Sequence, residues 1–146
     1  MMLCVCLLCA RVSFAEDPWF SAERYYQGDP NYVLVQERQE VRMYVDVSSI
    51  VSKIYEPPEY EISAVVMVVG PQPGAQRFLT ETWHYHYDPQ YRNRQMFVWD
   101  EQRSDWRRVP KFGDADSVTA NTVLVRPGGE FVWWKCYQMD FYYNQK

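Results

Sequence analysis

Cysteine is scarce in this 146-residue chain. Three of its four cysteines, Cys4, Cys6 and Cys9, lie close to the N-terminus, and only Cys136 lies beyond them. A chain that loses its first segment therefore keeps one thiol and forms no internal disulfide. This excludes the disulfide-stapled scaffolds of many small extracellular domains, so packing must hold the fold together.

The chain also lacks an apolar run long enough to cross a bilayer. Residues 1–10 are apolar, whereas a membrane-spanning helix needs about twenty such residues. Ser13 and Ala15 then supply the small residues that a signal peptidase requires, although no Lys or Arg precedes the apolar run. We expect residues 1–15 to be a signal peptide, with a buried N-terminal strand or helix as the alternative. The mature protein is then secreted, periplasmic or on the cell surface of bacteria, without stable membrane insertion.

Positive charge is in deficit, with 15 Lys and Arg against 19 Asp and Glu. Removal of residues 1–15 takes away Arg11 and changes the formal charge from −4 to −5, which argues against nucleic acid as a partner. The basic residues concentrate between positions 92 and 111. They predict either a surface for an anionic partner or, more commonly, a solvated face of hairpin loops. The residues of this candidate surface are Arg92, Arg94, Arg107 and Arg108.

The common catalytic patterns are missing too. There is no Gly-x-Ser-x-Gly elbow, and "PGGEF" lacks the spacing and the lysine of a phosphate-binding loop. Glu59 and Glu61 fit the solvent face of a strand better than a two-carboxylate hydrolase site. Cys136 falls in the apolar stripe of a predicted helix, where a thiol has a raised pKa and is inert. We therefore expect a protein that is not an enzyme and that holds no cofactor.

Aromatic residues, by contrast, make up 17% of the chain, and they favour strands. Strands are predicted over 32–38, 41–50 and 60–70, the last as a central strand, followed by a hairpin and a short strand near 104–110. The fold class is α+β. Residues 16–146 form one domain, a single antiparallel sheet or partly open barrel of five to six strands with a C-terminal helix packed on one face.

The C-terminal segment favours a helix over a strand. Val132, Cys136, Met139 and Tyr143 are spaced so that they share one helical face. Pro127 and the two glycines after it mark the predicted start of this helix. Residues 115–125, just before it, are compatible with either helix or strand.

The stretch "TWHYHYDPQYRNRQMFVWD", residues 82–100, predicts a hairpin with a loop near 88–94. Symmetric folding pairs Tyr87 with Gln95, Tyr85 with Phe97 and Trp83 with Trp99. A row of five large aromatics on one face is more typical of a core than of an open stacking surface. That face carries Trp83, Tyr85, Tyr87, Phe97 and Trp99, and the other carries Thr82, His84, His86, Met96, Val98 and Asp100.

His84 and His86 leave one face of a strand, as two metal ligands would. A zinc site needs at least three protein ligands, and the chain has no third histidine. In the predicted register Asp100 lies diagonally across from His84 and is the third ligand of an alternative site formed by His84, His86 and Asp100. We predict no metal site and expect both imidazoles to be hydrogen-bonded or solvated.

Three short motifs resemble the surface-adhesin protein E-like domains, small secreted bacterial domains. They are a Tyr-x-Asp-x-Ser-Ser-Ile stretch, a Tyr-Asp…Arg hairpin turn and a closing Phe-Tyr, within about residues 40–143. The resemblance implies a β-rich binding module of the cell surface or periplasm, and it transfers no catalytic residue and no ligand. The residues that carry it are Tyr44, Asp46, Ser48, Ser49, Ile50, Tyr87, Asp88, Arg92 or Arg94, Phe141 and Tyr142.

Together these features predict a secreted or envelope-associated, non-enzymatic, adhesin-like binding module whose surface or envelope partner is unknown. The alternative function is a metal-binding protein or hydrolase that uses the face with His84 and His86.

Overall fold

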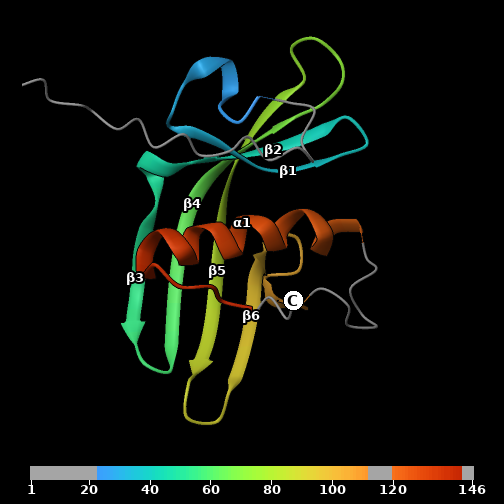
Figure 1. Ribbon diagram of the computed structural model, residues 1–146. Helices are drawn as coiled ribbons and strands as arrows, with labels where there is room; N and C mark the ends of the chain where they lie inside the picture. Colours follow the sequence, from blue (N-terminus) through green and yellow to red (C-terminus); the bar gives the residue numbers. More distant parts are fainter. Residues whose placement is uncertain (1–22, 112–119, 143–146) are drawn as a thin grey trace, which may run out of the picture.

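The computed structural model describes residues 23–111 and 120–142, and these form an open antiparallel sheet of seven strands with a long helix on one face (Figure 1). The strand order is β1-β2-β4-β5-β6-β7, and β3 also pairs with β4. The predicted α+β class is confirmed, with slightly more strands than expected. The elements are η1 (Tyr26–Gly28), β1 (Tyr32–Arg38), β2 (Val41–Asp46), η2 (Val47–Ser49), β3 (Val51–Glu56), β4 (Glu59–Val69), β5 (Gln76–Asp88), β6 (Asn93–Asp100), β7 (Asp105–Val109) and α1 (Ala120–Tyr137).

The prediction of one strand over residues 41–50 was wrong, and the strand β3 that follows at Val51–Glu56 was not predicted. Asp46 ends β2, and its Oδ1 accepts hydrogen bonds from the Ser48 amide at 2.9 Å and from the Ser48 hydroxyl at 2.6 Å. Ser49 Oγ donates to the Asp46 carbonyl at 2.7 Å and accepts from the Val65 amide at 2.8 Å. These bonds form the short helix η2, which turns the chain so that β3 lies beside the first half of β4.

The strand β4 is central, as its apolar sequence predicts. Its second half pairs with β2, its first half pairs with β3, and β5 pairs with its whole length. Ile62, Ala64 and Val66 of β4 are buried in the main core beneath α1. Met67 and Val69 instead join a second buried cluster with Leu34 and Tyr44, so part of the opposite face is also covered.

The helix α1 runs across the strands rather than along them (Figure 1), and two glycines let it approach the sheet. A Cβ atom on Gly129 would lie 2.6 Å from Met96 Sδ and 2.8 Å from Trp83 Cδ1. At this close approach the Tyr85 hydroxyl donates to the Gly129 carbonyl at 2.7 Å, and Trp83 Nε1 donates to the Val125 carbonyl at 3.3 Å. The polar atoms of these two buried aromatic side chains thus find their hydrogen-bond partners in the helix backbone.

The helix prediction was correct in type but wrong in its bounds. The helix begins at Ala120, so Pro127 lies inside it rather than at its start. It ends at Tyr137, because Gln138 adopts a left-handed conformation with φ of 56°. Met139 therefore lies outside the helix and is 40% exposed, not part of the apolar stripe. Of the ambiguous residues 115–125, those from 120 onward are helical.

The predicted hairpin exists, but its predicted register was wrong by one residue. Tyr87 pairs with Arg94 and Trp83 with Val98, and Asp88–Asn93 closes a four-residue loop. Asp88 Oδ1 accepts bonds from the Gln90 and Tyr91 amides, and Arg92 is left-handed with φ of 52°. Because side chains alternate along a strand, this difference of one residue places each side chain of β6 on the face opposite to the predicted one. Met96 and Val98 join Trp83 and Tyr85 in the core beneath α1, while Phe97 and Trp99 lie on the other face.

The described part of the chain contains no helix that is both long and apolar enough to span a membrane. The predicted signal peptide over residues 1–15 and the stripe residue Tyr143 lie outside the described residues.

Candidate functional site

The sheet face opposite α1 carries the two histidines. Cross-strand partners share a face, so the pairs Glu59–His86, His84–Phe97 and Trp99–Trp106 place these side chains together. The set spans β4, β5, β6 and β7, and we call it the open-face patch. It consists of Glu59, His84, His86, Phe97, Trp99 and Trp106.

The Glu59 carboxylate joins both imidazoles of the open-face patch. Its Oε2 lies 2.7 Å from His84 Nε2, and its Oε1 lies 2.5 Å from His86 Nδ1. An ionised carboxylate only accepts hydrogen bonds, so each imidazole donates through the named nitrogen. The side chains of Glu59, His84 and His86 are 42%, 27% and 26% exposed, so the cluster is within reach of solvent and of a ligand.

This arrangement changes the acidity of Glu59. Burial alone would raise the pKa of the carboxyl group, but the hydrogen bonds to His86 and His84 outweigh it, so the pKa lies below the usual value of 4.5. Glu59 is therefore ionised at neutral pH. It presents a fixed negative charge whose two oxygens are already oriented by the imidazoles.

Aromatic rings continue the patch across the neighbouring strands. The His84 ring centroid lies 5.5 Å from that of Trp106 and 6.2 Å from that of Phe97. Trp99 meets Trp106 edge-to-face at 5.3 Å. All three of Phe97, Trp99 and Trp106 are partly exposed, so the face presents rigid rings held by their neighbours beside a hydrogen-bonded carboxylate.

The predicted alternative metal site is not assembled. Asp100 lies on the same face of the sheet as Val98, which is the face with α1, whereas His84 lies on the opposite face. Asp100 instead accepts bonds from the Gln102 and Arg103 amides in the β6–β7 turn. Among the described residues no group of three or more His, Cys, Asp or Glu side chains is placed to hold a metal ion.

Among the described residues, the hydrogen bonds of the two imidazoles go to Glu59 and not to a hydroxyl or a thiol. Cys136 packs against the main core on the α1 side, and burial raises the pKa of its thiol. The hydroxyls of Ser63 and Thr82 are hydrogen-bonded to one another at 2.7 Å. Chemically, the open-face patch can accept and donate hydrogen bonds and stack against a ligand.

The four arginines of the candidate anionic-partner surface do not gather on one face. Arg94 and Arg107 are in register with Tyr87 and Val98 on the α1 side of the sheet, while Arg108 is in register with Phe97 on the opposite side. Arg92 lies exposed in the β5–β6 turn. The charge concentration seen in the sequence is therefore divided between two faces and a loop.

The motif residues that resemble adhesin protein E-like domains have structural contacts here. Arg94 donates to the Phe141 carbonyl at 2.6 Å and lies 4.9 Å from the centroid of the Tyr87 ring. The Tyr142 hydroxyl donates to the Val109 carbonyl at 2.5 Å and accepts from the Met96 amide at 3.2 Å. These contacts attach the segment after α1 to the sheet, so these four motif residues have a structural role.

Sequence reasoning missed four members of the open-face patch: Glu59, Phe97, Trp99 and Trp106. Glu59 was interpreted as an ordinary solvent-face residue, because nothing in the sequence pairs it with residues 25 and 27 positions later. Phe97 and Trp99 were expected in the core. The turn chemistry at Asp88, a side chain that caps the next amides, was the available signal for the correct register.

Comparisons with family models, with curated proteins and with solved structures found no match for this chain. The resemblance to adhesin protein E-like domains stays an expectation from the short motifs.

Proposed function

We propose that the protein is a non-enzymatic binding module, secreted or associated with the bacterial envelope, and that the open-face patch contacts its partner. The observation that carries this proposal is the row of partly exposed rings beside Glu59. Binding surfaces are enriched in Trp and Tyr, which supply a large contact area at low entropic cost. These rings are already held by their neighbours in the sheet, which lowers the cost of ordering them.

The open-face patch also supports the non-enzymatic part of the proposal. Its imidazoles are engaged by Glu59 rather than by a hydroxyl or thiol. The pattern of residues 1–15 supports export, and a mature protein that begins at Glu16 is expected outside the cytoplasm. Mass spectrometry of the native protein tests this point, and an intact N-terminus in the cytosolic fraction would contradict it.

Binding is tested by sedimenting intact cells of the producing strain with the purified protein. We expect the wild-type protein to sediment with the cells and Trp106→Ala to stay in the supernatant. Tyr91→Ala is the matched control, because Tyr91 is 74% exposed in the β5–β6 turn, outside the patch. Equal sedimentation of the two variants, or none of the wild-type protein, would contradict the proposal.

One contact bears on the alternative, a metal-binding protein or hydrolase: the Glu59 carboxylate contacts both imidazoles, one with each oxygen. Two imidazoles and a carboxylate are a common ligand set for transition metals. Zinc binding by the purified protein would distinguish this function from the binding module.

A further inference from the structure

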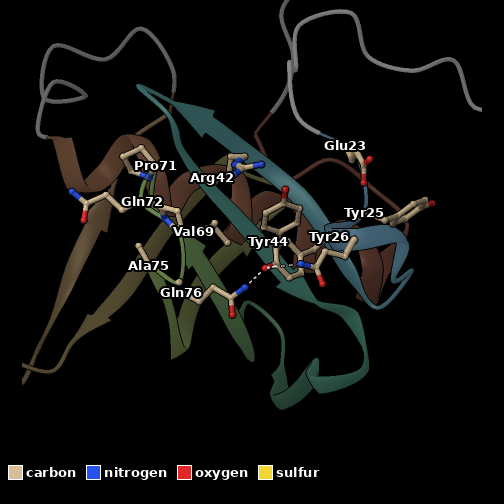
Figure 2. Close-up of a pocket in the computed structure, with 14 residues that line it drawn as sticks. Glu23, Tyr25, Tyr26, Arg42, Tyr44, Val69, Pro71, Gln72, Ala75 and Gln76 are labelled. Atoms are coloured by element: carbon tan, nitrogen blue, oxygen red, sulfur yellow. Dashed lines mark hydrogen bonds between the residues drawn. The ribbon is translucent and has the colours of Figure 1, made fainter.

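A hollow of about 500 Å³ lies beside Val69, where β4 ends, bordered by η1, β2 and the turn between β4 and β5 (Figure 2). The Tyr25 ring and the Gln72 amide point away from it, and Tyr26 is already hydrogen-bonded to Gln76. This hollow therefore presents few free polar groups to a ligand. The open-face patch, which contains the first residue of β4, is different because its polar atoms are not all engaged.

The free polar atoms of the Glu59 cluster are hydrogen-bond acceptors. An ionised carboxylate has about four lone-pair positions, and the two imidazoles occupy two of them. No described residue donates to the second ring nitrogen of either imidazole, His84 Nδ1 or His86 Nε2, and neither nitrogen is buried. In a neutral imidazole this nitrogen is also an acceptor, because the other one carries the proton. A group that only donates hydrogen bonds therefore fits the cluster better than one that also accepts them.

Carboxylates on the neighbouring strand positions favour a cation. Glu56 of β3 is the cross-strand partner of Glu59, and Glu61 is the partner of His84, so both lie on the face of the open-face patch. Glu56 is exposed and Glu61 is partly exposed. Three carboxylates thus border the imidazoles from β3 and β4, where they attract a cation and repel an anion.

Two basic residues of the same sheet do not cancel this charge. Arg108 of β7 shares the face but lies three strands from β4. Neighbouring strands are about 4.8 Å apart, so its backbone is on the order of 14 Å from β4, beyond the screening length of about 8 Å at physiological ionic strength. Lys53 in the bulge of β3 compensates at most one of the three carboxylates. The β4 side of the patch therefore stays acidic.

The aromatic rings of the patch select among cations. The His84 ring connects the two parts, because its Nε2 lies 2.7 Å from Glu59 and its centroid lies 5.5 Å from that of the partly exposed Trp106. A guanidinium group is planar, so it can stack on an indole and donate to both oxygens of a carboxylate. An ammonium group is a compact, strongly hydrated charge without a flat face. On the basis of the proposed function, we propose that the partner is a protein and that the open-face patch binds one of its arginine side chains.

The test is an NMR titration of the isotope-labelled protein with the blocked peptide acetyl-Gly-Arg-Gly-amide. Two comparison peptides carry lysine or citrulline instead, and citrulline has the shape of arginine without its charge. The arginine peptide is expected to shift the amide signals of His84 and Phe97 and the indole N–H signal of Trp106 saturably at millimolar concentrations. The lysine peptide should bind about threefold more weakly and the citrulline peptide about tenfold more weakly.

Variants of the patch locate the binding site. Glu59→Gln keeps the size of the side chain and removes its charge, so Kd for the arginine peptide should rise about tenfold. Trp106→Ala removes the stacking surface and should raise Kd about threefold. Glu101→Gln and Tyr91→Ala are the matched controls, because both residues are exposed in turns outside the patch and should leave Kd unchanged.

The proposal is overturned if the arginine peptide shifts none of the three signals, if the lysine or citrulline peptide binds as tightly, or if Glu59→Gln weakens binding no more than the controls do. The comparison of the three peptides uses the wild-type protein, so it does not depend on how a variant folds. Sedimentation of the wild-type protein with cells, without peptide binding, would overturn the arginine assignment alone. Peptide binding without sedimentation would contradict the proposed function instead.

Discussion

Substitution of Gly129 by alanine tests how closely α1 approaches the sheet. In an exposed helix this change stabilises a protein by about 1 kcal/mol, because alanine has the better helix propensity. Here the added Cβ would lie 2.6 Å from Met96 Sδ and 2.8 and 2.9 Å from Trp83 Cδ1 and Nε1. Non-bonded carbon atoms normally approach only to about 3.5–4.0 Å, so α1, Met96 or the indole must move.

The magnitude follows from the surroundings of the new methyl group. Trp83 and Met96 are fully buried, and overpacking of such a site costs about 1–3 kcal/mol. Because three contacts of the new Cβ lie below 3.0 Å, we take the upper part of that range, about 2–3 kcal/mol. After subtraction of the gain of about 1 kcal/mol in helix propensity, we expect Gly129→Ala to lower the free energy of unfolding by about 1–2 kcal/mol. That corresponds to a decrease in Tm of about 3–8 °C for a domain of this size.

Urea unfolding followed by circular dichroism is the assay, with the m-value as a check that the compactness of the two states is unchanged. Gly128→Ala is the matched control, since its Cβ would lie 3.2 Å from Trp83 Cζ2 and needs a smaller adjustment. In a Met96→Ala background the sulfur is absent, so the additional cost of Gly129→Ala should decrease. A stabilised or unchanged Gly129→Ala protein would refute the close approach of helix and sheet.

Three other predictions concern ionisable groups. The pKa of Glu59 is lowered in the folded protein, so its contribution to stability is present above about pH 4.5 and is lost as the pH falls through the folded pKa. Glu59→Gln should therefore flatten the decrease in Tm that is measured from pH 6 to pH 3. An unchanged acid profile would contradict the hydrogen-bonded cluster of Glu59, His84 and His86. Micromolar zinc should not raise the Tm of the wild-type protein, and a rise that is abolished in the His84→Ala, His86→Ala double variant would establish the metal-binding alternative. Burial raises the pKa of Cys136, so a bulky maleimide should modify it slowly in the folded state and rapidly in urea, whereas rapid native modification would show an accessible thiol.

Much of the fold was predictable because its signals are local. Alternating and apolar runs indicated most of the strands, and the buried β4 was identified as central from its unbroken apolar sequence. The aromatic Trp83 and Tyr85 were assigned to the core and are fully buried there. The C-terminal helix was identified by the spacing of Val132 and Cys136, and both residues pack in the main core.

Element boundaries and register were decided by contacts between distant residues. Pro127 is a typical helix start by local rules, yet α1 begins seven residues earlier. The register of β5 against β6 depends on whether the loop has an odd or an even number of residues, and the Asp88 turn makes that number four. A change of one residue moves Phe97 and Trp99 from one face of the sheet to the other.

The sequence by itself determined which segments favour a strand or a helix, and which residues are suited to the core. Only the tertiary structure decided which side chains meet. Glu59 reaches His84 and His86 because β4 and β5 pair in one particular register, and Gly129 is required because α1 crosses directly over Trp83. The physical reason is range: propensity and periodicity act over a few neighbouring residues, whereas register and close packing minimise the free energy of contacts between segments that lie far apart in the chain.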